Sequence, residues 1–131
     1  MLNDKNCVFC LKKNCDIIFF SNYFFLIRDT IYPVTKHHTL IITNRHVESF
    51  FDLNSDELRD LSDILKSQKK ILLNLDNKIT GFNVGVNIGK DAGQSIMHCH
   101  VHLIPRRSGD VENPRGGVRG VIPSKQKYER K

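Results

Sequence analysis

Three of the chain's six histidines fall within five residues, in the segment His98-Cys99-His100-Val101-His102. The histidines alternate with apolar residues, and alternation with a period of two is typical of a half-buried β-strand, whose successive side chains point to opposite faces. All three imidazoles are therefore predicted to share one face. Three polar rings cannot all be satisfied in an apolar core. The segment predicts either a metal site or a nucleophile flanked by helper groups, because neutral imidazole is both a common ligand and a good nucleophile.

The length and composition fit one folded domain. The 131 residues, 40% of them hydrophobic, can bury roughly two thirds of the surface of the unfolded chain. We therefore expect a single domain over residues 1–131. The N-terminus, Met1-Leu2-Asn3-Asp4-Lys5, does not resemble a signal peptide, and no apolar run approaches the length of a membrane span. We expect a cytoplasmic protein with no membrane partner.

The positive charge lies mostly at the C-terminal end. Residues 1–104 carry 12 basic and 11 acidic side chains, whereas residues 105–131 carry 8 basic and 3 acidic ones. This basic tail, residues 106–131, is either a solvated terminus or a surface that attracts anionic ligands such as nucleotides. The spacing of its residues does not decide between the two.

Two of the four cysteines form a C-x-x-C motif, Cys7-Val8-Phe9-Cys10, within residues 1–15. Cys15 follows it closely, and Cys99 lies inside the histidine segment. A disulfide framework is not expected in the cytoplasm, so the motif indicates half of a zinc site, a redox pair or ordinary thiols. A structural zinc ion needs four ligands, and the chain has no second C-x-x-C motif. Histidines from far along the chain would have to complete a tetrahedral Cys2His2 set.

Apolar and β-branched runs predict five strands. Residues 16–28 predict a hairpin that turns at Ser21-Asn22, and residues 39–43 predict a third strand. Residues 81–88 alternate again and are expected to pair with the histidine strand, through a glycine-rich loop over 89–95.

One long helix is predicted between the third and fourth strands. Asn54, three residues before Glu57, indicates a capping box, and apolar residues at helical spacing extend the helix to about Asp76. A shorter helical turn is expected over residues 46–51. The glycines and prolines of the tail indicate an ordered or semi-ordered loop with no further helix or strand.

Several segments together resemble one known family. Gly93-Gln94-Ser95, followed by the histidine segment and Leu103-Ile104, is similar to the signature of the histidine triad (HIT) superfamily of nucleotide hydrolases and transferases. The resemblance covers nearly the whole chain. It also includes Cys7-Val8-Phe9-Cys10, His38-Thr39-Leu40-Ile41-Ile42, Arg45-His46-Val47 and Gly85-Val86-Asn87. The run from Pro105 to Arg119 is similar to a bacterial subgroup of the dinucleoside polyphosphate hydrolase branch.

The resemblance implies a fold and an assembly. The fold is α+β and HIT-like, with a five-stranded antiparallel sheet and one long and one short helix. Two copies are expected to form a homodimer. The five strands and long helix that the residues themselves predict agree with this fold, but they do not indicate the dimer.

The resemblance also implies a reaction. His100 would attack the α-phosphorus of a nucleotide and hold the nucleotidyl group until water displaces it; covalent catalysis of this kind divides one difficult displacement into two easier ones. His102, on the same face, would hydrogen-bond a phosphate oxygen or assist the leaving group. The residues that the resemblance places on the substrate are Asn87, Gln94 and Ser95, near the phosphates, and Asp29, on the ribose hydroxyls.

His98 has two possible roles. Zinc-bearing relatives place the matching histidine in a structural zinc site, which here would consist of Cys7, Cys10, His46 and His98. A closed set of four ligands would pin the N-terminus to the catalytic strand without Lewis-acid chemistry. In the alternative role, His98 only orients His100.

The chain departs from the family pattern at three places. Lys36-His37 stands where many relatives have Pro-Gly, Thr43-Asn44 replaces a common Pro-Lys, and the interval from Asp29 to Pro33 is a residue longer than expected. These changes bear on the ribose contact of Asp29 and leave the triad untouched.

Three functions remain to be compared. The first is a hydrolase or nucleotidyl transferase that acts through His100 on a purine nucleotide or a dinucleoside polyphosphate, such as diadenosine tetraphosphate. The second is a protein that binds purine nucleotides with little turnover. The third is a zinc-based nucleic-acid module, which we do not favour because the chain has no tryptophan and no evident row of exposed aromatic residues.

Overall fold

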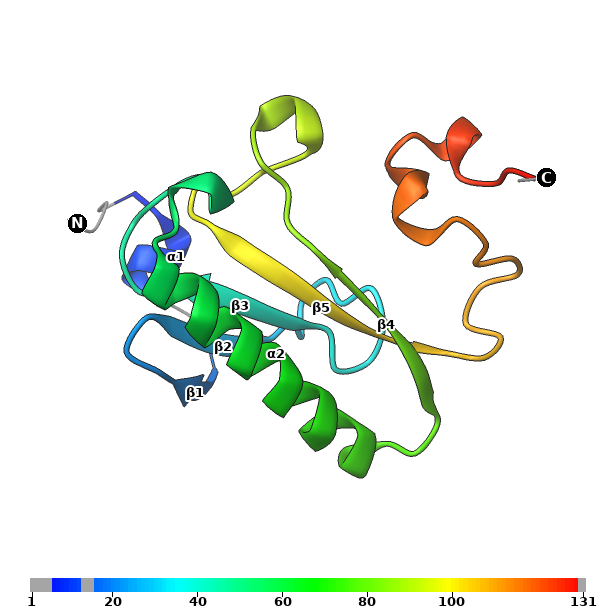
Figure 1. Cartoon of the computed structure of the whole chain (residues 1–131), viewed down its shortest axis with the longest axis horizontal. Helices are drawn as coiled ribbons and strands as arrows, with labels where there is room; N and C mark the ends of the chain where they lie inside the picture. The colour runs from blue at the N-terminus through cyan, green and yellow to red at the C-terminus, as the bar shows by residue number, and fades with distance from the viewer. Residues whose placement is uncertain (1–5, 13–15, 130–131) are drawn as a thin grey trace.

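One antiparallel sheet of five strands organises the molecule. The computed structural model describes residues 6–12 and 16–129, so Cys15 lies outside the described residues. The strands are β1 (Ile17–Phe20), β2 (Phe24–Arg28), β3 (Thr39–Thr43), β4 (Ile79–Gly85) and β5 (His100–Arg107). Their order across the sheet is β1-β2-β3-β5-β4, and every neighbouring pair is antiparallel (Figure 1). The predicted sheet is confirmed.

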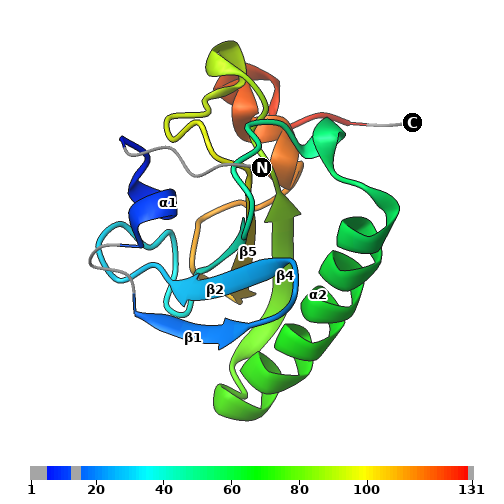
Figure 2. The same cartoon turned by 90° about the vertical axis from the view of Figure 1, so that its left-hand side faces the viewer.

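Two α-helices lie on opposite sides of this sheet. The long helix α2 (Ser55–Leu75) runs along one face, and the short helix α1 (Val8–Leu11) lies on the other (Figure 2). The predicted capping box is present, because the side chain of Asn54 accepts from the backbone N–H of Glu57 and that of Glu57 accepts from the N–H of Asn54. The α+β class, with one long and one short helix, is confirmed.

The short helix is not where the sequence indicated. Residues 46–51 contain only the beginning of a 3₁₀ turn, Phe50–Asp52, which Ser49 caps. The preceding residues are held in other contacts, since the carbonyl of Val47 accepts from the N–H of Cys99. The short α-helix forms instead at the C-x-x-C motif, with Cys7 as its N-cap.

The inner strands separate two apolar layers. Because α2 covers one face and α1 the other, β3 is buried along its whole length and β2 along most of its own. Strands buried on both faces have continuous apolar sequences, as these two do. The layer under α2 includes Phe24, Leu26, Ile41, Cys99 and Val101. The layer under α1 includes Cys7, Phe9, Phe25, Ile27, Leu40 and Ile42.

The hairpin of β4 and β5 differs in extent from its prediction. β4 begins at Ile79 and ends at Gly85, earlier than the predicted strand over 81–88, and Gly85 already pairs with His102. β5 begins at His100, so His98 lies just before the strand, where its N–H donates to the carbonyl of Ile96. The connection between the two strands is consequently longer than the predicted loop over 89–95.

One departure from the family pattern, at His37, falls where the backbone has a positive φ. His37 has a φ of 72°, in the left-handed region that glycine adopts without steric cost. The family pattern given by the resemblance has a glycine at this position, and glycine would suit this backbone. In this chain a histidine adopts the same conformation, so the turn into β3 is kept and the substitution is strained.

The tail contains two short helices that the sequence did not predict. Residues Gly117–Val121 and Pro123–Lys125 form 3₁₀ helices, and the first of them lies beside β4. Gly116 makes this possible, because a Cβ at that position would collide with the backbone carbonyl of Gln126. The collision depends on a contact between distant tail residues, which local composition does not reveal. Within residues 6–12 and 16–129, no helix has both the length and the apolar character needed to cross a membrane.

Candidate active site and metal centre

The three histidines of the segment lie on the α1 side of the sheet. The ring of Phe9, from α1, is edge-on to both His98 and His100, with ring centroids 5.9 and 5.1 Å apart. The rings of His100 and His102 follow each other along β5 with centroids 5.2 Å apart. The predicted sharing of one face is therefore confirmed, although His98 precedes the strand.

A backbone contact defines the tautomer of His100. Its Nδ1 lies 2.7 Å from the carbonyl oxygen of His98. A carbonyl oxygen can only accept, so Nδ1 carries the proton and the lone pair of Nε2 is available to a ligand or an electrophile. Burial is the main effect on the ring and lowers the pKa of His100, while the hydrogen bond to His98 opposes this effect. His100 is thus a buried, neutral imidazole with a defined nucleophilic nitrogen.

A second histidine, His38, defines the tautomer of His102. Nδ1 of His38 accepts from the backbone N–H of Val34 at 3.0 Å, so Nε2 of neutral His38 carries its proton. That Nε2 lies 2.9 Å from Nδ1 of His102, which must then be the acceptor. The proton of His102 is left on Nε2. This chain of hydrogen bonds turns His102 into a donor beside His100.

Sequence reasoning did not identify His38 as part of the site. The signal was present in part, because His38 stands two residues before Leu40, next to the predicted strand over 39–43. Leu40 pairs with His102 across β3 and β5. The pairing register brings His38 to His102, and alternation within one strand does not reveal it.

His102 is the most strongly perturbed of these rings. Burial is the largest cause, and the neighbouring His100 and His38 add to it, whereas Asp29 opposes it; together they lower the pKa of His102 to about 4. Burial likewise lowers the pKa of His38, and Asp29 again opposes the effect. Both rings are neutral near pH 7, as their hydrogen-bond chain requires.

This shift predicts a loss of stability in mild acid. Folded His102 takes up its proton near pH 4, whereas a histidine in the unfolded chain does so near 6.5. Between these values the unfolded chain holds more protons, so the free energy of unfolding decreases as the pH falls from about 6.5 towards 4. Urea unfolding at several pH values measures this decrease. His102→Gln, which removes the titrating ring, should make it smaller; an unchanged pH dependence would contradict the assignment.

Four potential metal ligands meet beside the triad. The ligand atoms of Cys7, Cys10, His46 and His98 all lie within 4.8 Å of one another. Nδ1 of His98 is 3.3 Å from Sγ of Cys7 and 3.4 Å from Sγ of Cys10, and Nδ1 of His46 is 3.1 Å from Sγ of Cys10 and 3.2 Å from Nδ1 of His98. Ligands around a tetrahedral zinc ion are separated by roughly 3.3 to 3.8 Å, given Zn–S and Zn–N bonds of about 2.3 and 2.0 Å. The donor set and its spacing fit such an ion.

The ring of His98 is oriented for a metal. Its Nε2 lies 2.8 Å from the carbonyl oxygen of Thr43, so Nε2 carries the proton and Nδ1 presents a lone pair to the two thiols and His46. The backbone carbonyl of His98 itself accepts from Nδ1–H of His100. The two roles foreseen for His98 are therefore compatible, because the ring faces the metal cluster and the backbone orients His100.

The glycine-rich loop before the triad holds two predicted substrate residues differently. Gln94 is buried, and its Nε2 donates to the carbonyls of Glu48 and Ile96 while its Oε1 accepts from the N–H of Gly89. The side chain of Gln94 thus braces the loop. Ser95, the next residue, is exposed. Of these two predicted substrate residues, only Ser95 has a solvent-exposed side chain.

The other two predicted substrate residues flank the site. Oδ1 of Asp29 accepts from the backbone N–H groups of Ile31 and Tyr32, so this carboxylate organises the turn that follows β2. Asn87 lines a cavity of about 610 Å³, which His102 also lines. The structure therefore places Asn87 beside the triad and gives Asp29 a local backbone role.

Comparison with known proteins adds to this geometry. A family model described as the HIT domain matches residues 11–109, which are more than half of the chain and include the triad and all five strands. The chain belongs to the HIT family.

Curated HIT relatives match at about one third identity. An uncharacterized HIT-like protein of Methanocaldococcus jannaschii is 34% identical over 109 residues, which are 81% of this chain and 83% of that protein. The asymmetrical bis(5'-nucleosyl)-tetraphosphatase of Schizosaccharomyces pombe is 35% identical over 78 residues, which are 60% of this chain. The match spans only 42% of the length of that enzyme.

A solved HIT structure has the same fold. The crystal structure of a Zn-bound histidine triad family protein from Mycobacterium smegmatis aligns with a TM-score of 0.73 and 28% identity. The alignment covers 82% of this chain and 80% of that one. The HIT fold of this protein is thereby established, and the four-residue cluster can hold a metal ion.

Proposed function

We propose that this HIT protein is a nucleotide hydrolase or nucleotidyl transferase that cleaves dinucleoside polyphosphates, such as diadenosine tetraphosphate, at the α-phosphate. The observation that carries the proposal is the paired tautomers of the triad, with a lone pair on Nε2 of His100 beside a proton on Nε2 of His102. The tetraphosphatase of Schizosaccharomyces pombe, a partial relative, supports the choice of substrate class.

In the first step, Nε2 of His100 forms a bond to the α-phosphorus. The bond from phosphorus to the bridging oxygen breaks, and its electron pair leaves with that oxygen. The phosphorylated ring carries a positive charge, which the carbonyl of His98 stabilises through Nδ1–H. In the second step, water attacks the phosphorus, the P–N bond breaks, and the water proton goes into solution as the nucleoside monophosphate forms.

His102 stabilises the leaving group in this scheme. A departing phosphate oxygen is already anionic, so the Nε2–H of His102 needs only to hydrogen-bond to it. An amine leaving group needs a proton, which a neutral His102 does not give up, so that proton would have to come from water while His102 hydrogen-bonds to the departing group. Ser95 and Asn87 are proposed to contact the phosphates, and Asp29 is proposed to contact the ribose. Gln94 would act indirectly, by holding the glycine-rich loop in place.

The cluster of Cys7, Cys10, His46 and His98 is proposed to hold a structural zinc ion. Bound zinc would supply a cross-link between the N-terminal segment, the chain just before β5 and the chain after β3. All four ligands would come from the protein, which leaves no coordination site for substrate. His98 then serves the reaction by position, through the carbonyl that orients His100.

Residues 1–131 are proposed to form a single HIT domain, with a zinc-site N-terminus and a basic tail over 106–131. A homodimer is proposed from the resemblance alone. β4 is an edge strand of the sheet, so a second copy could pair with it. Light scattering, which gives the mass in solution, tests the dimer.

The activity assay for the proposal is direct. Purified protein is incubated with diadenosine tetraphosphate, and the products are separated by ion exchange. We expect release of adenosine monophosphate together with a protein-bound nucleotide that acid removes, as a P–N linkage requires. Binding of the dinucleotide without release of any mononucleotide would instead identify a purine-nucleotide-binding protein.

A further inference from the structure

The cavity beside His102 is built by two parts of the chain that are distant in sequence. One wall comes from β4 and β5, with Val84 and Ile104, and also carries His102 and Asn87. The other wall comes from the tail, where Val118 and Val121 face the cavity. Its volume of about 610 Å³ lies within the range of small-molecule sites, roughly 300 to 1,000 Å³.

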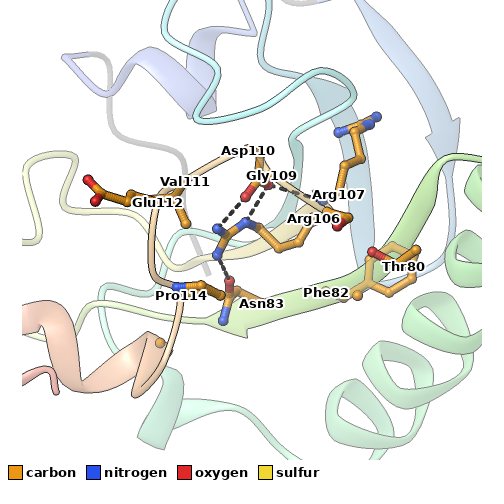
Figure 3. Close-up of a pocket in the computed structure, with 13 residues that line it drawn as sticks. Thr80, Phe82, Asn83, Arg106, Arg107, Gly109, Asp110, Val111, Glu112 and Pro114 are labelled. Carbon is orange, nitrogen blue, oxygen red and sulfur yellow. Dashed lines mark hydrogen bonds and ion pairs between the residues drawn. The ribbon is translucent and has the colours of Figure 1, made fainter.

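An ion pair holds the tail in place next to this cavity. The guanidinium of Arg106 donates from Nε and Nη2 to the two carboxylate oxygens of Asp110, both at 2.8 Å, and from Nη1 to the amide oxygen of Asn83 at 2.8 Å (Figure 3). Asp110 also accepts from the backbone N–H of Arg107. Bidentate pairs of this kind fix geometry, so the turn after β5 directs the tail back over β4.

The lining of the cavity favours a nucleoside over a bare phosphate. Arg106, which also lines it, is already neutralised by Asp110. Val118 and Val121 expose 62% and 74% of their surfaces, an unusual amount for apolar side chains next to a candidate catalytic group. A flat, apolar base would cover them.

The position of the cavity relative to His100 indicates which of the two nucleosides of the substrate it would bind. The leaving oxygen departs opposite the attacking nitrogen, and His102 is the donor that follows His100 along β5 and also lines the cavity. The basic tail is suited to attract a polyanionic chain leading to it. We propose that the cavity beside His102 binds the second nucleoside of a dinucleoside polyphosphate, which departs with the leaving group. This inference rests on the proposed function.

The test compares two substrates that share the adenylyl half. Diadenosine tetraphosphate has a leaving group with a nucleoside, whereas adenosine 5′-phosphoramidate loses only ammonia. Val121→Asp places a charge on the cavity wall, and we expect the ratio of kcat/KM for the dinucleotide to kcat/KM for the phosphoramidate to fall about tenfold or more. Ile122→Asp is the matched control, because Ile122 is the exposed next residue in the tail and does not line the cavity.

Each outcome decides the proposal. A fall in the ratio for Val121→Asp, with the parent ratio kept by Ile122→Asp, supports the subsite. Equal losses on both substrates, or equal falls in both variants, overturn it while leaving the hydrolase intact. Light scattering is run in parallel: a change of mass in Val121→Asp with an unchanged ratio would show that a second copy covers the cavity. If the parent protein releases adenosine monophosphate from neither substrate, the hydrolase proposal itself fails.

Discussion

His100→Ala is expected to reduce the release of adenosine monophosphate from diadenosine tetraphosphate by roughly a thousandfold or more, because it removes the atom that bonds to phosphorus. The affinity for the dinucleotide should change little, since binding uses other parts of the site. The acid-labile protein adduct should disappear. Steady-state kinetics, equilibrium dialysis and quenching of the labelled reaction in alkaline denaturant, in which a P–N linkage survives, measure these three quantities.

Two further variants make this result specific. His100 is buried, so its loss leaves a small cavity against Phe9; His100→Gln fills most of that space without a nucleophile and should be equally inactive but more stable. His37→Gly removes a histidine outside the triad and relieves a left-handed backbone, so it should keep parental turnover. Normal turnover by His100→Ala would eliminate the covalent mechanism.

The shared face of His100 and His102 was predictable from the sequence, because alternation along a strand is a local property. Residues two apart along an extended chain share a face whatever their partners are, so the placement of His100 and His102 together needed no tertiary information. The capping box at Asn54 was equally local, since its donors and acceptors lie within three residues. Both features are set by the geometry of one element.

The contacts that assign protons were not predictable in this way. His38 meets His102 because of the register in which β3 pairs with β5. The contact between the carbonyl of His98 and His100 is local, but strand alternation alone does not reveal it. The meeting of Cys7 with His98 spans nearly the whole chain, and the family resemblance rather than spacing indicated it. The helical form of the tail likewise depends on a distant packing contact at Gly116.

Removing the metal is expected to destabilise the protein strongly. We expect about one zinc ion per purified chain, as a closed set of four ligands requires. Chelation or Cys10→Ser would release the N-terminal segment, and with it Phe9, from the layer under α1. The free energy of metal binding is part of the folding free energy. A loss of about 3 kcal/mol lowers the Tm of a chain of this size by roughly 10 °C, which calorimetry with and without chelator measures.

The same experiment separates a structural metal from a catalytic one. Below the lowered Tm, chelated protein should keep much of its turnover, because the ring of His98 is also held by the carbonyl of Thr43 and its own carbonyl still orients His100. Cys99→Ala is the matched control, since Cys99 lies in the layer under α2 and should keep the zinc content unchanged. Complete loss of turnover in chelated protein with an unchanged Tm would mean that the ion takes part in the chemistry. Purified protein without zinc would remove His46 and His98 from the set of ligands.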